Sequence, residues 1–202
     1  MAIVKFENFL EGEMYEKTVD AAENALTIGE NLFSTNYSWN KSVKKDSYPV
    51  LCHNLDKHTF MYEDIKWLIE SKTGYTPQKG HILLYYWTRH SYIPWHRDSY
   101  KVIENEQEKY IPYDAALTVY LNREWDKDSG GYFLYEDNDE IKAILPKRNL
   151  GILQYDSLYH STTPVNYDGD VKITLQVFLK KKNVYITVPH ELTQYYEKAN
   201  IK

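Results

Sequence analysis

Apolar residues from His81 onward fall in short runs separated by turn-forming Gly, Asn and Asp. Runs of this length, bounded by turn formers, are typical of β-strands. We therefore predict eight strands, over residues 81–87, 93–98, 115–122, 131–136, 141–145, 150–154, 158–161 and 171–179. Eight short strands are typical of a jelly roll that closes over a ligand cavity.

The last run shows the clearest alternation of apolar and polar residues. Its odd-numbered residues from Val171 to Leu179 are all aliphatic, whereas the residues between them are Lys172, Thr174, Gln176 and Phe178. Successive side chains of a strand face opposite sides, so the first set is predicted to join the core and the second to line a mixed polar interior. A cation in such an interior is costly unless it meets an anion. Lys172 therefore either binds an anion or lies at a strand end and reaches solvent.

Two segments of the first half have apolar residues at helical spacing. We predict one helix from Phe9 to Ile28, ending near Gly29, and a second from Thr59 to Lys72. The intervening residues 36–58 are polar, aromatic and irregular. The predicted fold class is thus mainly β, with helices flanking a jelly-roll core.

These patterns divide the chain into three parts of one domain. Residues 1–79 form a helical N-terminal part, residues 80–182 the β core, and residues 183–202 a C-terminal extension with an expected edge strand at 184–188 and a short helix at 191–199. A length of 202 residues is most simply one domain with room for a sizeable core.

Residues 99–113, between the second and third predicted strands, show almost no apolar pattern. A loop this long inside a compact domain is usually functional or disordered. We favour a lid over a site rather than a mobile insertion, because the segment leaves directly from Asp98.

Charge and cysteine content restrict the partners and the compartment. A net charge of −5 and a pI of about 5.8 give no electrostatic footprint for a nucleic-acid backbone. No long apolar run predicts a membrane span or a signal peptide, and the single cysteine, Cys52, has no partner for an internal disulfide. We expect a cytoplasmic protein that binds neither nucleic acid nor membrane.

The candidate chemistry lies at His96, Asp98 and His160. Alternate residues of an extended chain face the same way, so His96 and Asp98 can point at one metal ion while Arg97 points elsewhere. Two imidazoles and one carboxylate on one face of Fe(II) leave three positions open. A lone His-x-Asp is more often a surface hydrogen bond, but here His160 and then Lys172 follow, supplying a third ligand and a cation for an anionic co-substrate such as a 2-oxo acid.

Several motifs of the core carry a family resemblance. The segment from Gly80 to Lys180, about half of the chain, resembles the Fe(II)- and 2-oxoglutarate-dependent dioxygenases, and within them the prolyl hydroxylase branch of the prolyl 4-hydroxylase catalytic-domain type. The matching residues are His81–Tyr86, His96-x-Asp98, Leu117–Asn122, Trp125-Asp126, Gly130-Gly131, Pro146, His160 with Pro164, and Lys172.

The resemblance implies a double-stranded β-helix, with His96, Asp98 and His160 as both metal ligands and catalytic residues. It also implies 2-oxoglutarate as co-substrate, O2, and a role for ascorbate as a reductant. Lys172 then binds the far carboxylate of 2-oxoglutarate, where collagen-type enzymes have lysine and hypoxia-type enzymes arginine. Tyr86, ten residues before His96, Thr174 and Tyr120 are further expected co-substrate contacts.

The implied reaction is hydroxylation of a C–H bond, with release of succinate and CO2. By resemblance, the expected substrate is a prolyl residue in a peptide or protein. Two alternatives stay open: a hydroxylase of a free amino acid or other small molecule, which would have a closed pocket, and a catalytically silent metal-binding jelly roll.

Overall fold

A computed structural model describes residues 3–28, 33–34, 48–55, 60–166 and 171–182. Its helices are α1 (Glu13–Ile28), α3 (Phe60–Thr73) and the short 3-10 helix η2 (Lys127–Ser129). Its strands are β1 (Ile3–Phe6), β2 (Phe33–Ser34), β3 (Leu51–Asn54), β4 (Tyr75–Trp87), β5 (Ile93–His96), β6 (Ser99–Glu104), β7 (Gln107–Pro112), β8 (Ala115–Tyr120), β9 (Phe133–Asp137), β10 (Glu140–Ile144), β11 (Gly151–Tyr155), β12 (His160–Thr162) and β13 (Lys172–Lys181).

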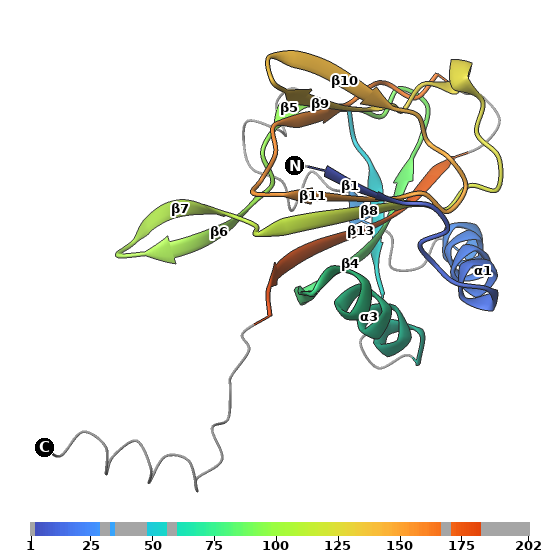
Figure 1. Ribbon diagram of the computed structural model, residues 1–202, viewed down its shortest axis with the longest axis horizontal. Coiled ribbons are helices and arrows are strands. Elements are labelled where there is room, and N and C mark those ends of the chain that lie inside the picture. Colours follow the sequence, from blue (N-terminus) through green and yellow to red (C-terminus); the bar gives the residue numbers. More distant parts are fainter. Residues whose placement is uncertain (1–2, 29–32, 35–47, 56–59, 167–170, 183–202) are drawn as a thin grey trace, which may run out of the picture.

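The strands form two facing sheets and a separate hairpin (Figure 1). The larger sheet has the order β1-β11-β8-β13-β4-β3-β2, and the smaller one the order β10-β9-β12-β5. The strand pairings of the described residues in both sheets are antiparallel. All eight strands predicted from the sequence are present, with ends shifted by a few residues in most of them.

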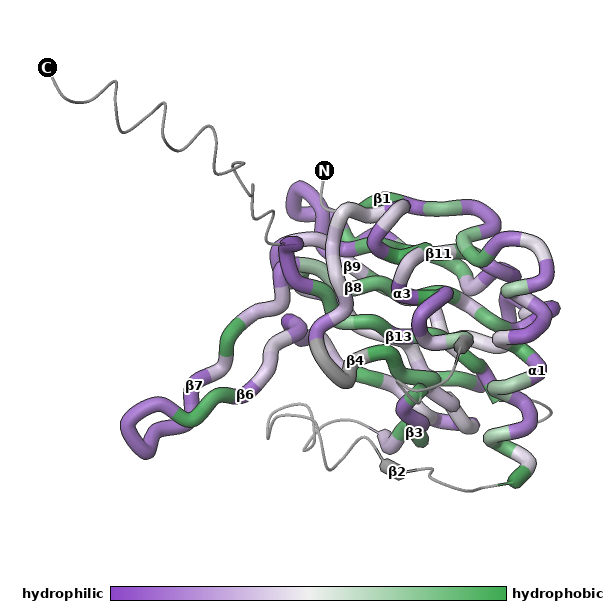
Figure 2. Tube along the Cα trace, turned by 90° about the horizontal axis from the view of Figure 1, so that it is seen from below, coloured by the Kyte–Doolittle hydropathy of each residue, from purple (hydrophilic) through white to green (hydrophobic). Residues whose placement is uncertain are grey.

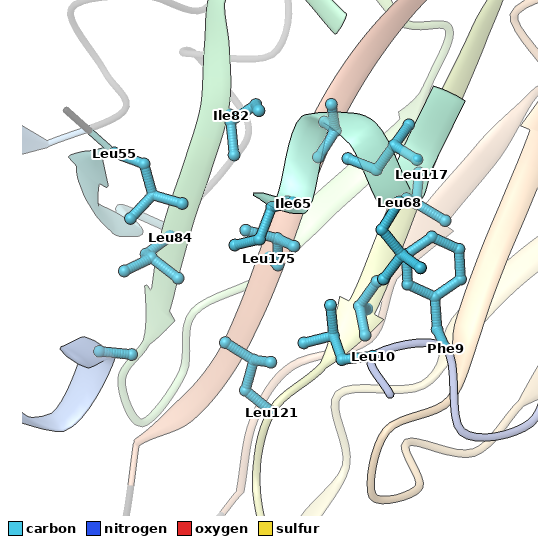
Figure 3. Packing of buried hydrophobic residues seen from close by; sticks show 14 of the residues in the cluster. Phe9, Leu10, Leu55, Ile65, Leu68, Ile82, Leu84, Leu117, Leu121 and Leu175 are labelled. Atoms are coloured by element: carbon cyan, nitrogen blue, oxygen red, sulfur yellow. The ribbon is translucent and has the colours of Figure 1, made fainter. Parts of the chain in front are cut away.

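Both long helices cover the outer face of the larger sheet (Figure 1). Figure 3 shows Ile65 and Leu68 of α3 close to Leu117 and Leu175 of the sheet. These side chains are at most 3% exposed and belong to one apolar cluster. Burying a Leu or Ile side chain contributes roughly 1.5–3 kcal/mol, so this layer supplies much of the stability that holds the sheet in place.

The inner face of the larger sheet is more polar, as the alternation along residues 171–179 predicts. Ile173, Leu175, Val177 and Leu179 lie in the helix-covered cluster, whereas Lys172, Thr174 and Gln176 are buried on the opposite face. The Thr118 hydroxyl donates a cross-strand hydrogen bond to Gln176 Oε1, which gives two polar groups of this inner face a partner. The interior between the two sheets is therefore lined by polar side chains.

The first predicted helix begins later than expected. We predicted a start at Phe9, but α1 begins at Glu13. Asn8 and Gly12 have positive φ angles of 54° and 51°, which a right-handed helix does not allow. Phe9 is instead a buried residue of the preceding turn and packs into the core.

The part of the chain before residue 80 also contributes strands, contrary to its predicted helical character. β1 pairs with β11 and β3 pairs with β4, so both extend the larger sheet. β3 lies within residues 36–58, which we predicted to be irregular, and β4 begins at Tyr75 rather than at 81. Short strands are specified by their partners more than by their own sequence, which explains the omission.

Residues 99–113 are not a loop but the β6–β7 hairpin, which projects from the body of the protein (Figures 1 and 2). Asn105 and Glu106 form its turn, and both have positive φ, as a two-residue hairpin turn of type I′ requires. Cross-strand ion pairs join Lys101 to Glu108 and Lys109 to Glu104. Pairing of polar side chains, rather than an apolar stripe, accompanies these strands.

The expected edge strand at 184–188 and helix at 191–199 lie outside the described residues. Among the helices that the structure describes, none has the length and apolar character needed to cross a membrane.

Candidate metal centre

Pairing of β5 with β12 brings the three predicted ligands together. His160 lies opposite His96 in the ladder, and their rings are 4.3 Å apart between centroids. Directly opposite residues in an antiparallel pair point to the same side of the sheet. Asp98 follows β5 by two residues, and its side chain points back to both rings. The three side chains are at most 13% exposed.

The ligand atoms are spaced as a metal site requires. Asp98 Oδ1 is 3.3 Å from His96 Nε2, and Asp98 Oδ2 is 3.7 Å from His160 Nε2. One ligand atom from each residue lies within 4.8 Å of the other two. Among the described residues, this is the group of His, Cys, Asp and Glu side chains that meets that spacing.

Both histidines are oriented by the backbone two residues before them. His96 Nδ1 is 2.8 Å from the carbonyl oxygen of Pro94, and His160 Nδ1 is 2.8 Å from that of Leu158. A carbonyl oxygen only accepts, so each Nδ1 carries the proton and donates it. Each Nε2 then has its lone pair free toward Asp98, which is how metal-binding histidines are usually prepared. This donor set, two imidazoles and one carboxylate, fits Fe(II) with open positions.

Charge and burial act together on the protonation of these groups. Burial lowers the pKa of His160 to about 4, so this ring is neutral near pH 7. Burial acts to raise the pKa of Asp98, but the two histidines outweigh it and the pKa is lowered. Burial likewise acts to lower the pKa of His96, yet the Asp98 carboxylate beside it raises that pKa. The neutral His160 ring and the lowered pKa of Asp98 both favour the deprotonated forms that bind a metal.

A second layer of contacts fixes Asp98. Gln154 Nε2 donates to Asp98 Oδ2 across 2.6 Å, and the Ser157 hydroxyl donates to the Asp98 carbonyl oxygen across 2.7 Å. Arg97 points the other way, as the alternation predicts, and donates to the carbonyl oxygen of Ser157 across 2.7 Å. The turn before β12 is thereby tied to the end of β5.

Lys172 is the fully buried cation of the interior. It is 2% exposed, its Nζ donates to the Gly131 carbonyl oxygen across 2.9 Å, and it lies 4.2 Å from the centroid of the Trp87 ring. No carboxylate of the described residues pairs with it, and burial lowers its pKa to about 7. The solvent-accessible alternative for Lys172 is therefore wrong, because the side chain turns inward.

The Gly130-Gly131 pair makes room for this arrangement. A Cβ atom at Gly131 would lie 2.9 Å from Lys172 Cδ and 3.1 Å from its Nζ. A Cβ atom at Gly130 would lie 2.2 Å from the carbonyl oxygen of Pro164, and both glycines have positive φ. Side chains at these positions would collide with Lys172 or with the chain next to it.

Thr174 and Tyr120 lie on the same inner face as Lys172. They are paired directly across β13 and β8, and both are buried. The Thr174 hydroxyl accepts a hydrogen bond from Trp87 Nε1 across 3.0 Å, and the Tyr120 ring lies 5.8 Å from Lys172 Nζ. Tyr120 also packs in one cluster with Phe133, whose ring stacks on His160 at 5.1 Å. A continuous lining thus joins Lys172 to the metal ligands.

Tyr86 does not lie in this lining, which corrects its prediction as a co-substrate contact. Its register partner is Ile173, on the helix-covered face, and its hydroxyl donates to the carbonyl oxygen of Ala22 in α1. The inward-facing neighbours are Tyr85 and Trp87, which pair with Thr174 and Lys172. The prediction rested on the number of residues between Tyr86 and His96, which does not determine the face of the strand on which Tyr86 lies.

Two residues of the site were missed from the sequence, Trp87 and Gln154. The signal for Trp87 was available, because it stands one place after Tyr86 in a strand whose alternate residues face opposite sides. Gln154 is the polar member of the run 151–155, a single amide among apolar neighbours. A lone polar residue in a buried strand indicates a specific partner, although it does not say which one.

The arginines Arg123 and Arg148 lie at the surface and do not approach the interior. Both pair with Glu16 on the outer surface of α1. Lys172 is thus the buried basic side chain on the inner face of the larger sheet.

Comparison with known sequences places this geometry in context. The sequence profile of the 2OG-Fe(II) oxygenase superfamily matches residues 80–180, which contain the three candidate ligands and Lys172. No curated protein sequence gives a significant match to the chain.

Several solved structures resemble the fold. A prolyl-4-hydroxylase from Pseudomonas putida has a TM-score of 0.63 at 10% identity and covers 90% of this chain and 93% of its own. A Trichoplax adhaerens prolyl hydroxylase in complex with a hypoxia inducible factor peptide fragment has a TM-score of 0.64 at 13% identity, covering 89% and 84%. A viral collagen prolyl hydroxylase from Paramecium Bursaria Chlorella virus-1, as a 2OG complex, has a TM-score of 0.57 at 15% identity, covering 89% and 96%. The predicted double-stranded β-helix with flanking helices is confirmed.

Proposed function

This chain belongs to the 2OG-Fe(II) oxygenase superfamily, and from that premise we propose that it hydroxylates a C–H bond of a prolyl residue in a peptide or protein, releasing succinate and CO2. The family implies Fe(II), 2-oxoglutarate and O2 as its reactants and cofactors. The observation that carries the oxygenase assignment is the buried ammonium group of Lys172, which faces the same interior as His96, Asp98 and His160 and has no carboxylate partner among the described residues.

Each residue has a distinct role in this proposal. His96, Asp98 and His160 would hold Fe(II), which with O2 and 2-oxoglutarate supplies the oxidising chemistry. Lys172 would neutralise the far carboxylate of 2-oxoglutarate, and the Thr174 hydroxyl beside it would add a hydrogen bond. One oxygen atom of O2 enters succinate and the other enters the hydroxyl group of the product, so the reaction balances without a further reductant. Ascorbate would serve only to restore iron that has been oxidised.

The prolyl substrate rests on separate support. A row of aromatic rings runs from the interior to the base of the hairpin. The ring centroid of Phe178 on the inner face lies 4.5 Å from that of Tyr113, which lies 5.1 Å from that of Tyr100. Proline-rich segments dock on aromatic-lined surfaces because their extended conformation is preformed. The Trichoplax enzyme of the same fold binds a peptide. We propose that this row of rings forms one side of a peptide-binding groove.

Succinate formation from 2-oxoglutarate with Fe(II) tests the proposal. The reaction is run alone, with a panel of proline-containing peptides and with free amino acids including proline. Stimulation by peptides is expected, and stimulation by free amino acids alone would instead identify a small-molecule hydroxylase. Mn(II) binding without any Fe(II)-dependent turnover would instead identify a catalytically silent metal-binding jelly roll.

A further inference from the structure

Gln154 has two polar atoms in the buried site, and only one of them has a partner. The side chain is 3% exposed and lies on the inner face of β11. Its Nε2 donates to Asp98 Oδ2 across 2.6 Å, whereas its Oε1 has no hydrogen-bond partner among the described residues. Leaving a buried acceptor unpaired costs roughly 1–3 kcal/mol, so such an atom calls for an explanation.

The orientation of the amide is fixed by its neighbour. If nitrogen and oxygen were exchanged, Oε1 would face Asp98 Oδ2 across 2.6 Å. A carboxylate that binds a metal carries no proton, so two acceptors would then face each other at that distance and repel. The unpaired acceptor is therefore Oε1.

Asp98 depends on this one amide. Its Oδ1 lies near His96 Nε2 and its Oδ2 near His160 Nε2, so the carboxylate stands between the two histidines. A carboxylate on a single χ2 torsion rotates freely unless one oxygen is tied, since such torsions have broad minima. Of the described side chains, Gln154 donates to this carboxylate without being a ligand candidate itself.

We infer that Gln154 is the positioning residue of the metal centre: its Nε2 fixes the Asp98 carboxylate for metal binding, and its Oε1 accepts a hydrogen bond from a donor that is present only in the loaded site, such as a water molecule on the metal. This inference rests on the proposed metal site. It extends that site by one residue, which itself contacts no metal.

Mn(II), a redox-silent substitute for Fe(II), is the probe, with its affinity measured by titration calorimetry on the full chain. Gln154→Met keeps the length of the side chain but removes both polar atoms. Groups that orient metal ligands typically contribute 10–100-fold to metal affinity, so we expect Mn(II) to bind 10–100-fold more weakly. Gln154→Asn keeps the amide but withdraws it by one methylene, and we expect a similar loss with less effect on packing.

The matched control is Gln176→Met. Gln176 is also a buried glutamine of the inner face, but it accepts from the Thr118 hydroxyl and not from a metal-ligand residue. Its replacement is expected to change the Mn(II) affinity by less than about threefold. Thermal unfolding of each metal-free variant separates loss of folding from loss of positioning.

The outcomes distinguish this inference from the proposed function. If the unsubstituted protein binds no Mn(II), the metal site itself fails. If it binds Mn(II) and both folded Gln154 variants bind equally well, the inference is wrong and the metal site stands. If Gln176→Met loses as much affinity as Gln154→Met, the effect belongs to the loss of any buried amide, and the positioning role is likewise wrong.

Discussion

The ammonium group of Lys172 donates a hydrogen bond to the carbonyl oxygen of Gly131 across 2.9 Å, and it packs where a side chain at Gly131 would otherwise be. The glycine is therefore part of the cation's environment. Gly131, in the loop before β9, and Lys172, at the start of β13, together define one end of the interior.

Gly131→Ala tests this contact. The new methyl group would approach Lys172 to about 3 Å and would also strain a backbone with a φ of +68°, so we expect a loss of stability and weaker 2-oxoglutarate binding. Gly74→Ala is the matched control, because Gly74 has a φ of +75° but no atom within 4 Å of the added Cβ. Backbone strain of this kind costs on the order of 1 kcal/mol in either variant. If the two variants lose equal stability and bind 2-oxoglutarate equally well, Lys172 does not need the glycine.

Lys172→Ala should raise the KM for 2-oxoglutarate strongly. Truncating one partner of a buried charge pair costs on the order of 2–5 kcal/mol, because the other charge is left buried and unpaired. Arg148→Ala serves as the control, since this arginine pairs with Glu16 at the surface. Steady-state succinate formation gives the KM for 2-oxoglutarate of both variants. An unchanged KM in Lys172→Ala would show that the far carboxylate lies elsewhere.

The binding of 2-oxoglutarate should weaken as the pH rises above 7. Burial lowers the pKa of Lys172 to about 7, and only the protonated form attracts a carboxylate. A bound anion raises that pKa again, so binding takes up a proton above pH 7, and affinity falls by up to about tenfold per pH unit. Titrating the Mn(II)-saturated protein with 2-oxoglutarate between pH 6.5 and 9 measures this affinity. Lys172→Arg keeps its charge over this range, so a slope equal to that of the unsubstituted protein would assign the effect to another group.

The three candidate ligands act as one unit, so removal of any one should nearly abolish 2-oxoglutarate turnover. His96→Ala, Asp98→Ala and His160→Ala are each expected to retain the fold, measured by circular dichroism, and to lose Mn(II) binding. His90→Asn is a control outside the centre, and asparagine tolerates the positive φ of 68° at this position. Normal Fe(II)-dependent succinate formation by His160→Ala would disprove the assignment of the ligands.

The sequence predicted those parts of the fold that depend on periodicity. The alternation along residues 171–179 correctly separated the core face from the inner face and placed Lys172 and Thr174. The His-x-Asp spacing predicted that two side chains would point to one side of β5. Both inferences rest on strand geometry, which does not depend on distant contacts.

Features that depend on distant partners were not predictable in the same way. Gln154 acquires its role from Asp98, which lies 56 residues earlier in the chain. The β6–β7 hairpin places polar pairs such as Lys101 with Glu108 across its strands and lacks the apolar alternation by which strands are recognised. For Tyr86 the prediction followed its family-like spacing from His96. The alternation of side chains along its own strand would have placed it on the face away from Lys172.

The hairpin is expected to behave as a lid whose order depends on the site. It begins one residue after Asp98. Its Tyr100 ring contacts Tyr113, which stacks on Phe178 of the inner face, so a change at the metal centre is expected to reach the base of the hairpin. Mn(II) with 2-oxoglutarate should stabilise the whole protein by roughly 2.7 kcal/mol at a hundredfold excess over Kd. Trypsin cleavage after Lys101 or Lys109 should slow by more than this stabilisation explains, and further with a true substrate. Equal protection at lysines elsewhere, or none at these two, would show that the hairpin is independent of the site.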